Sequence, residues 1–394
     1  MTAASSALTA PGTGLGTAPG LPAGGLAVDP GFWRDRRVFL TGHTGFKGAW
    51  LALWLKTLGA RVTGFSLGAP PTQPSLFELA RVGEGDLQSV VGDVRDAALL
   101  TRTLAQARPE VVVHMAAQSL VRRSYAEPRE TYEVNVMGTV NLLDAVRQAG
   151  AQVRAVVVVT SDKCYENREW EWAYREHEPM GGHDPYSNSK GCAELITGAY
   201  RHSFFARPED PRVASARAGN VIGGGDWSED RLVADLMRGA LAEEAVRVRN
   251  PSAIRPWQHV LNPLSGYLAL AQALWSSPEH ARGWNFGPAE QDALSVGDLV
   301  GRLSALWPGG LELVGDADAQ AAELSVPHEV PHEAHYLKLD SSLAHSRLGW
   351  HPRWGLQEGL RETVRWYRGL LEGEDMRALT VAQIEAFQQV EALA

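Results

Sequence analysis

Cysteine is nearly absent from this 394-residue chain, which carries only Cys164 and Cys192. Two cysteines cannot build a disulfide framework, so a disulfide-stapled fold is excluded and a reducing cytoplasm is predicted. No histidine stands next to Cys164 in the sequence to activate its thiol. We therefore predict that Cys164 packs in the core and is not a nucleophile.

Positive charge is also scarce, because 37 Lys and Arg face 46 Asp and Glu, for a net charge of 37 − 46 = −9. There is no basic stripe, which argues against a nucleic-acid partner. No apolar run approaches the roughly 20 residues that span a bilayer, which argues against a membrane partner. The N-terminal segment lacks a basic region followed by an apolar core, so we predict a disordered tail over residues 1–30 and no signal peptide.

The remaining chain alternates short apolar runs with helical patterns. Several runs are apolar on both faces, as buried parallel strands are, and the alternation predicts an α/β doubly wound parallel sheet with a Rossmann-like order. We assign residues 31–220 to a dinucleotide-binding domain that carries the catalytic residues. Residues 221–394 are assigned mainly to a smaller lobe, from which segments can return to the sheet. The predicted strands are Arg37–Thr41, Arg61–Leu67, Ser89–Gly92, Val111–Met115, Ala155–Thr160 and Val213–Ala218.

Two helices are predicted from apolar spacing. An amphipathic stretch over Ala49–Leu58 follows the first strand, and a longer helix over Thr131–Gly150 ends at its glycine. The apolar stripe of the longer helix consists of Val134, Met137, Val140, Leu143 and Val146. The segment Trp350–Leu371 has near-helical apolar order and is predicted to lie in the core of the lobe.

Glycines follow the first strand in the order Gly42, Gly45 and Gly48. A glycine turn between a strand and a helix lets the backbone approach a pyrophosphate, whose charge the helix N-terminus favours. This spacing differs from Gly-x-Gly-x-x-Gly, and a simple tight turn is the alternative. In a parallel sheet, ligands bind where the strands end. The strand ends here are Thr41-Gly42, Asp93, Ala116-Ala117-Gln118 and Ser161.

Tyr186 and Lys190 are four residues apart and would share one face of a helix. We predict that the charge of Lys190 lowers the pKa of the Tyr186 phenol and makes it a usable base. This pair is common on exposed helices and is a weak signal without the glycine turn. Ser161-Asp162-Lys163 comes shortly before it and predicts a second chemical event after an oxidation. The alternative is that Asp162 and Lys163 form a surface ion pair.

These segments are long enough to carry a resemblance. Over about residues 30–370 the chain resembles the extended short-chain dehydrogenase/reductase family, and within it the CDP-glucose 4,6-dehydratases. In the dTDP-glucose branch the corresponding pair of residues resembles Asp-Glu, whereas this chain has Asp162-Lys163, as in the CDP-glucose branch. The segments that match are Thr-Gly-His-Thr-Gly-Phe-Lys-Gly (41–48), His-Met-Ala-Ala-Gln (114–118), Thr-Ser-Asp-Lys-Cys-Tyr-Glu-Asn (160–167), Asp-Pro-Tyr-Ser-Asn-Ser-Lys-Gly-Cys-Ala-Glu (184–194), Ala-Arg-Ala-Gly-Asn-Val-Ile-Gly-Gly-Gly-Asp-Trp (216–227) and Arg-Pro-Trp-Gln-His-Val (255–260).

The resemblance implies a lyase that converts CDP-glucose into CDP-4-keto-6-deoxyglucose with NAD as a recycled cofactor. Tyr186 would take the proton of the C4 hydroxyl, which Ser161 would also hydrogen-bond, and Lys190 would bind the nicotinamide ribose. Lys163 would be the base at C5, for which its pKa must be depressed. Asp162 would be the acid at C6, for which its pKa must be raised.

The implied cofactor contacts centre on the glycine turn, with Asp93 positioned to meet the adenine amino group. No carboxylate stands at the end of the second strand, Gly64–Leu67, to bind a ribose hydroxyl, so this position leaves NADP open. The full set of predicted cofactor residues is Thr41, Gly42, Thr44, Gly45, Phe46, Lys47, Gly48, Asp93, Val94, Ala116, Ala117, Tyr186 and Lys190.

For the substrate, Arg255 is the strongest candidate diphosphate ligand because its guanidinium can bind phosphate through two bonds. Arg231 and Arg249 are weaker candidates, with a solvated surface charge as the alternative for each. Asn220 and Gln118 are predicted to contact sugar or phosphate. Asn135 is expected to be structural or a proton relay, and Trp227 and Trp257 to line a base pocket or the core. The choice of cytidine rests on the resemblance.

The alternatives are a nucleotide-sugar 4-epimerase, a dehydratase for another nucleotide-sugar, and a noncatalytic NAD-binding regulator. An epimerase needs neither an acid at C6 nor a base at C5, so Asp162 and Lys163 argue against it. A regulator would tolerate loss of Tyr186 or Lys190, and both are present. A homodimer or higher homo-oligomer is expected from the resemblance, with helices near 97–107 and 131–149 forming an intermolecular four-helix bundle.

Overall fold

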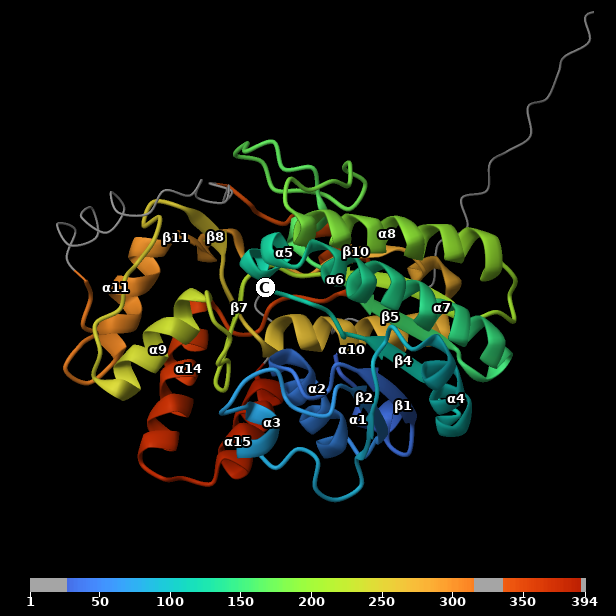
Figure 1. Cartoon of the computed structure of the whole chain (residues 1–394), viewed down its shortest axis with the longest axis horizontal. Coiled ribbons are helices and arrows are strands. Elements are labelled where there is room, and N and C mark those ends of the chain that lie inside the picture. The colour runs from blue at the N-terminus through green and yellow to red at the C-terminus, as the bar shows by residue number, and fades with distance from the viewer. Residues whose placement is uncertain (1–26, 315–335, 391–394) are drawn as a thin grey trace, which may run out of the picture.

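A seven-stranded sheet forms the centre of the structure, a computed structural model that describes residues 27–314 and 336–390 (Figure 1). All its neighbouring strands are parallel, in the order β10-β6-β5-β4-β1-β2-β3. The predicted Rossmann-like α/β class is confirmed, and each predicted strand agrees with the structure to within one residue at either end. The strands are β1 Arg37–Thr41, β2 Arg61–Ser66, β3 Gln88–Val91, β4 Val111–His114, β5 Ala155–Val159, β6 Arg212–Arg217 and β10 Gly283–Asn285.

Helices cover both faces of this sheet (Figure 1). The valines of β4 show the two layers, because Val111 and Val113 pack into the core with α2 and α10, whereas Val112 packs into a second core with α4 and α7. Side chains of α8 also contact the second core. The covering helices are α2 Phe46–Thr57 and α10 Leu261–Ser276 on one face, and α4 Ala97–Ala107, α7 Gly138–Ala149 and α8 Pro185–Phe204 on the other.

The prediction of an amphipathic helix over Ala49–Leu58 is wrong in its pattern. The helix begins at Phe46, and every residue from Gly48 to Leu55 is buried. The reason is that α15 (Met376–Gln389) packs against α2 on the side away from the sheet, where Trp54 and Phe387 meet edge to face at 5.6 Å between ring centroids. A helix enclosed on all sides needs no polar face.

The helix predicted over Thr131–Gly150 is interrupted by a π-helical turn at Glu133–Met137, between α6 (Pro128–Tyr132) and α7. The predicted apolar stripe is wrong at Met137, which is 49% exposed, while Asn135 is buried. The extra residue of a π turn rotates the following side chains and explains both positions. Gly150 does end α7, with φ at 67°.

The chain after residue 220 builds a smaller region and also returns to the sheet. Its strands pair as β7 with β9 in parallel and β8 with β11 antiparallel. The helix α10 packs on the sheet, and β10 extends it beside β6. β10 was not predicted because its three residues carry no pattern. The bounds are β7 Val221–Ile222, β8 Ile254–Pro256, β9 Gln258–His259, β11 Ala293–Ser295, α9 Leu232–Ala242, α11 Val296–Leu306 and α14 Leu356–Leu371.

The core position predicted for Trp350–Leu371 is confirmed by the burial of Trp354, Leu360 and Tyr367. Almost all of the tail predicted over residues 1–30 lies outside the described residues. No helix in residues 27–314 and 336–390 is long and apolar enough to cross a bilayer. The remaining short elements are α1 Pro30–Trp33, α3 Leu76–Leu79, α5 Val121–Ala126, α13 Ser342–Leu348 and the 3₁₀ turns Gly150–Gln152, Asp162–Cys164, Pro278–His280 and Glu290–Asp292.

Candidate active site

The carboxyl ends of β1, β4 and β5 lie side by side because these strands are neighbours in the sheet. The segments that follow them approach one another closely. A side chain added at Gly42 would place its Cβ 2.8 Å from the backbone nitrogen of Ala116, so only glycine fits there. Gly42 also has φ at +76°, which L side chains avoid. Two loops that are far apart in sequence, those after β1 and β4, therefore meet closely at this edge of the sheet.

The glycine turn fits a dinucleotide. A Cβ at Gly48 would lie 2.0 Å from the carbonyl oxygen of Gly42, so this glycine allows α2 to pack on the turn. Gly45 is different, because the nearest atom to its added Cβ is 3.5 Å away. Gly45 stands at the N-cap of a 12-residue helix, where no side chain caps the amides. Gly45 is therefore less crowded than Gly42 and Gly48, and it stands at a helix N-terminus, where the backbone amides can bind a pyrophosphate.

The far end of the predicted cofactor site is less conventional. β2 ends at Ser66, whose hydroxyl lies 3.5 Å from the backbone nitrogen of Thr44, and no carboxylate stands there. Asp93 follows β3, but its carboxylate accepts a bond of 2.6 Å from the Arg95 guanidinium. That bond lowers the pKa of Asp93. Any contact of Asp93 with adenine would have to share this carboxylate with Arg95.

The reactive cluster is built on the 3₁₀ turn after β5. The Ser161 hydroxyl accepts the Lys163 N–H at 3.2 Å and donates to Asp162 Oδ1 at 2.8 Å. Asp162 is 2% exposed, and its Oδ2 has no hydrogen-bond partner among the described residues. Burial raises the pKa of Asp162, against the opposing charge of Lys163, which confirms the prediction of a raised pKa. Its burial also rules out the surface ion pair.

Tyr186 and Lys190 lie on one face of α8, and both are buried. The predicted lowering of the Tyr186 pKa is wrong in this structure. Burial disfavours the phenolate and raises the pKa of Tyr186 to about 12, while the Ser161 hydroxyl and the Arg231 charge oppose the rise. Burial lowers the pKa of Lys190 to about 8, and the charge of Glu194 opposes that fall. Desolvation therefore outweighs the help of nearby cations.

The predicted cofactor residue Lys47 is a second lysine in the crevice. It lies next to Tyr267, a residue that the sequence analysis did not identify. The Lys47 ammonium donates to the Tyr267 hydroxyl at 3.0 Å. Burial lowers the pKa of Lys47 to about 7, and the charges of Arg231 and Lys190 lower it further. Burial raises the pKa of Tyr267, and the charge of Asp162 adds to the effect. Tyr267 lies within the apolar helix α10, so no local pattern marks it.

The three predicted phosphate ligands are not equally placed. Arg255 is 6% exposed, and its charge lowers the pKa of Asp162. The charge of Arg231 lowers the pKa of both Tyr186 and Lys47, so this guanidinium also lies at the crevice. Arg249 instead pairs with Asp230 at 2.9 Å, with 37% of its side chain exposed. Arg231 and Arg255 are thus brought together with the reactive cluster, and Arg249 is held at the surface.

The predicted amide ligands Gln118 and Asn220 differ in the hydrogen bonds that they make within the protein. The Gln118 side chain donates to the Thr131 hydroxyl at 2.9 Å, and its backbone N–H donates to Asn135 Oδ1 at 2.8 Å. Asn135 donates back to the Gln118 carbonyl at 2.9 Å, which supports the structural interpretation of this asparagine. Asn220 is half-buried after β6, and its carbonyl accepts the Gln258 N–H at 3.1 Å.

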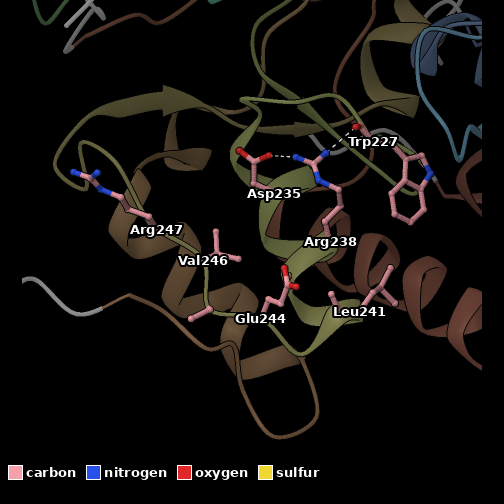
Figure 2. Close-up of a pocket in the computed structure, with 10 residues that line it drawn as sticks. Trp227, Asp235, Arg238, Leu241, Glu244, Val246 and Arg247 are labelled. Atoms are coloured by element: carbon pink, nitrogen blue, oxygen red, sulfur yellow. Dashed lines mark hydrogen bonds and ion pairs between the residues drawn. The ribbon is translucent and has the colours of Figure 1, made fainter. Parts of the chain in front are cut away.

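A cavity of about 580 Å³ lies beside α9 (Figure 2). It is lined by Trp227 and by the segment 244–247, which approaches α9 across the hollow. Arg238 donates to the Trp227 carbonyl at 2.7 Å and pairs with Asp235. None of the predicted catalytic residues lines this cavity, so it is not the reaction centre. Trp257 is buried in the main core rather than here.

Comparisons with known proteins agree with this geometry. A model of the GDP-mannose 4,6-dehydratase family matches residues 39–363. CDP-glucose 4,6-dehydratase of Salmonella typhimurium is 53% identical over 365 residues, which cover 91% of this chain and 98% of that protein. DesIV, a dTDP-glucose 4,6-dehydratase of Streptomyces venezuelae solved with NAD bound, superposes with a TM-score of 0.69 at 25% identity, over 86% of this chain and 99% of that one.

An epimerase superposes equally well. UDP-glucose 4-epimerase of Thermus thermophilus, solved in complex with NAD, has a TM-score of 0.69 at 25% identity, over 84% of this chain and 99% of that one. The backbone alone therefore does not separate dehydration from epimerisation, and the side chains of the crevice must do so.

The raised pKa of Asp162 predicts a pH-dependent cost to stability. The folded protein binds this proton more tightly than the unfolded chain does, so stability falls as pH rises from the unfolded to the folded pKa of Asp162. An Asp162→Asn variant escapes that loss. Its melting temperature should exceed that of the wild type, by a margin that grows with pH, in thermal unfolding across acidic to neutral pH.

Asp375 provides a control of opposite sign. A bond from Arg81 lowers the pKa of this exposed carboxyl, so its contribution is present above its unfolded pKa and is lost as pH falls. Relative to the wild type, the Asp375→Asn variant should not become more stable as pH rises. An Asp162→Asn melting curve that follows the wild type at every pH would contradict the raised pKa of Asp162.

Proposed function

We propose that this chain, which belongs to the GDP-mannose 4,6-dehydratase family, converts CDP-D-glucose into CDP-4-keto-6-deoxy-D-glucose. The observation that carries the proposal is the free oxygen of Asp162, a buried carboxyl with a raised pKa and one oxygen without a partner among the described residues. A carboxyl kept protonated in a crevice can donate its proton to a leaving hydroxyl. Epimerisation at C4 needs no such group.

The cofactor of this reaction is NAD, held by the glycine turn. DesIV, which superposes on this chain, was solved with NAD, and Gly45 leaves the N-terminus of α2 without a side chain in the way of a pyrophosphate. Thr41, Gly42, Thr44, Phe46, Lys47 and Gly48 complete the turn, with Asp93, Val94, Ala116 and Ala117 at the neighbouring strand ends. When bound, NAD accepts a hydride from C4 of the sugar and returns it to C6, so it is not consumed.

Tyr186 is the base for the C4 hydroxyl, and Ser161 hydrogen-bonds the same oxygen. Burial holds the pKa of Tyr186 near 12, so its proton must leave with the help of positive charge. Lys190 in its charged form supplies part of that charge from the same face of α8 and holds the nicotinamide ribose. Arg231 supplies a second positive charge, which lowers the pKa of Tyr186.

Lys163 and Asp162 carry out the elimination that follows. Once C4 is a ketone, the proton on C5 becomes acidic, and Lys163 removes it. Asp162 protonates the C6 hydroxyl, which leaves as water. The Ser161 hydroxyl binds Asp162 Oδ1, so Oδ2 is the oxygen that remains for the proton transfer. The proposed acid and base are consecutive residues of one 3₁₀ turn.

The nucleotide diphosphate is bound by arginines of the smaller region. Arg255 is buried near Asp162, and Arg231 lies beside Tyr186, so both can reach a diphosphate that places its glucose at the reactive cluster. Arg249, Gln118 and Asn220 are proposed as outer contacts. The cytidine base is taken from the Salmonella relative, which is 53% identical to this chain.

We also propose a homodimer in the cytoplasm. Large apolar side chains are exposed at Met137 before α7 and at Leu195 and Phe204 on α8, with exposures of 49%, 63% and 48%. Two neighbouring helices with such side chains form a face that a second copy can cover. Among the described residues, α4 presents no large exposed apolar side chain. We therefore propose α8 as the neighbour of α7 in this interface. Both cysteines are unpaired, as a reducing compartment requires.

The reaction is tested by incubating the purified protein with CDP-glucose, dTDP-glucose and GDP-mannose in separate mixtures that contain NAD+. Mass spectrometry should show the loss of one water from CDP-glucose alone. Water loss from another substrate would keep the reaction and overturn the cytidine assignment. An epimer of unchanged mass would contradict the dehydratase and leave Asp162 without a role.

The second step is tested by Lys163→Ala. Loss of the base at C5 should lower dehydration about 10²-fold or more, whereas the oxidation at C4 should continue and leave reduced cofactor on the protein. Product mass and the absorbance of the reduced cofactor follow the two steps separately. Lys338→Ala is the matched control, since Lys338 is half-buried and plays no part in the proposed site. Unchanged turnover of Lys163→Ala would remove Lys163 from the mechanism.

The dimer is tested by Leu195→Asp. A charge at the centre of the α7–α8 face should convert the dimer to a monomer in light-scattering measurements of molar mass. Leu371→Asp is the control, because Leu371 is 64% exposed on α14, away from this face. A wild-type monomer, or a Leu195→Asp dimer, would contradict this interface.

A further inference from the structure

Glu194 is a buried carboxylate that the reaction itself does not use. It lies on α8, four residues after Lys190 and eight after Tyr186, so the three side chains share one face of the helix. Only 4% of its side chain is exposed. Its oxygens accept bonds from the Thr160 hydroxyl at 2.5 Å and the Ser215 hydroxyl at 2.6 Å.

Arg217 on β6 is the charged partner of Glu194. Its guanidinium donates to Glu194 at 2.7 Å and, through its other terminal nitrogen, to the Tyr165 hydroxyl at 2.7 Å. Tyr165 in turn donates to Asn285 on β10 at 2.7 Å. The pair is almost completely buried, with 4% of each side chain exposed. Both charges are thus compensated and bonded within the protein.

The bond from Thr160 to Glu194 and the bond from Arg217 to Tyr165 lie on either side of Asp162 and Lys163 in the sequence. Thr160 comes directly before Ser161, and Tyr165 comes directly after the 3₁₀ turn that ends at Cys164. One end of the ion pair therefore holds the chain before the turn, and the other end holds the chain after it. A shift of Asp162 and Lys163 together with the whole turn would strain or break these bonds.

The same carboxylate acts on Lys190 through its charge. Burial lowers the pKa of Lys190 to about 8, and Glu194 opposes that fall. The other groups that face Lys190 are Cys164, and, from α2 and β4, Lys47 and His114. Lys47 disfavours the charged form of Lys190. The charge of Glu194 is thus a main support of a protonated Lys190.

We propose that the Glu194–Arg217 ion pair is a positioning device that clamps the chain on both sides of the Asp162–Cys164 turn and keeps Lys190 charged. The proposal rests on the function proposed above, since it assigns these two roles to residues that serve that reaction. Glu194 and Arg217 touch neither the sugar nor the cofactor in this scheme. They act through Thr160, Tyr165 and Lys190.

The charge is tested by Glu194→Gln, which keeps the size of the side chain. We expect kcat to fall by about 10²-fold, because small displacements of catalytic groups are costly, while KM for CDP-glucose changes by less than about twofold. Without the negative charge the pKa of Lys190 falls below its present value of about 8. Lys190 then loses its proton at lower pH, so the alkaline limb of the kcat profile should move to lower pH.

The clamp is tested separately by Thr160→Val and Tyr165→Phe, which leave the ion pair in place. Thr160→Val removes the bond to Glu194, and Tyr165→Phe removes the bonds to Arg217 and Asn285. Each should lower kcat by roughly tenfold without moving the alkaline limb. Glu194→Asp keeps the charge and should restore the position of that limb while kcat stays low. These variants also keep the inference testable if Glu194→Gln does not fold. Wild-type kcat and pH profiles in Thr160→Val, Tyr165→Phe and Glu194→Asp would overturn it.

Hydrogen exchange gives a readout that needs no substrate. Amides of residues 160–165 should exchange faster in Thr160→Val than in the wild type, whereas those of residues 37–48 should not change. Unchanged exchange over residues 160–165 would overturn the clamp, whatever the enzyme turns over. A wild-type protein that dehydrates none of the three nucleotide-sugars would instead overturn the proposed function. The two failures are therefore distinguishable.

Discussion

A fully parallel sheet is the constraint on which this site depends. Every strand ends at the same edge, so the loops after β1, β4 and β5 must pass one another closely. Glycines mark the closest approaches. A side chain at Gly42 would strike Ala116, and one at Gly219 would come within 3.0 Å of Asp162. The backbone itself therefore brings together a cofactor turn and a reactive turn that are more than a hundred residues apart in the sequence.

Burial in that crevice has opposite effects on acids and bases. It raises the pKa of Asp162 and Tyr186 and lowers the pKa of Lys190 and Lys47, because in each case the charged form loses its hydration. In the proposed reaction the raised pKa suits Asp162 as a proton donor. The same effect opposes Tyr186 as a proton acceptor, so that reaction needs positive charge around the phenol. The cations in the crevice therefore have a second effect besides phosphate binding, since a positive charge such as that of Arg231 lowers the pKa of Tyr186.

Most of the sheet and the central part of the candidate site could be predicted from the sequence. Short runs such as Val111–His114 are apolar on both faces and are easily recognised, and Tyr186 with Lys190 is a local helical pair. The features that could not be predicted depend on packing between residues far apart in the sequence. Tyr267 meets Lys47 across 220 residues from within an apolar helix. The raised pKa of Tyr186 is likewise a property of the closed fold, because burial is its main cause.

The same sheet and glycine turn serve epimerases as well as dehydratases, so the difference between them must be small in structural terms. In this chain the acid and the base that we propose for dehydration stand on one 3₁₀ turn. Ser161 would hydrogen-bond the reacting oxygen in either reaction, and in this chain its hydroxyl also caps the turn and fixes one oxygen of Asp162. An acid and a base can thus be added after the serine without moving β5 or α8. In the proposed reaction the two groups of this turn act on adjacent carbon atoms, so the turn must be held firmly. A buried ion pair with bonds to both ends of the turn meets that need.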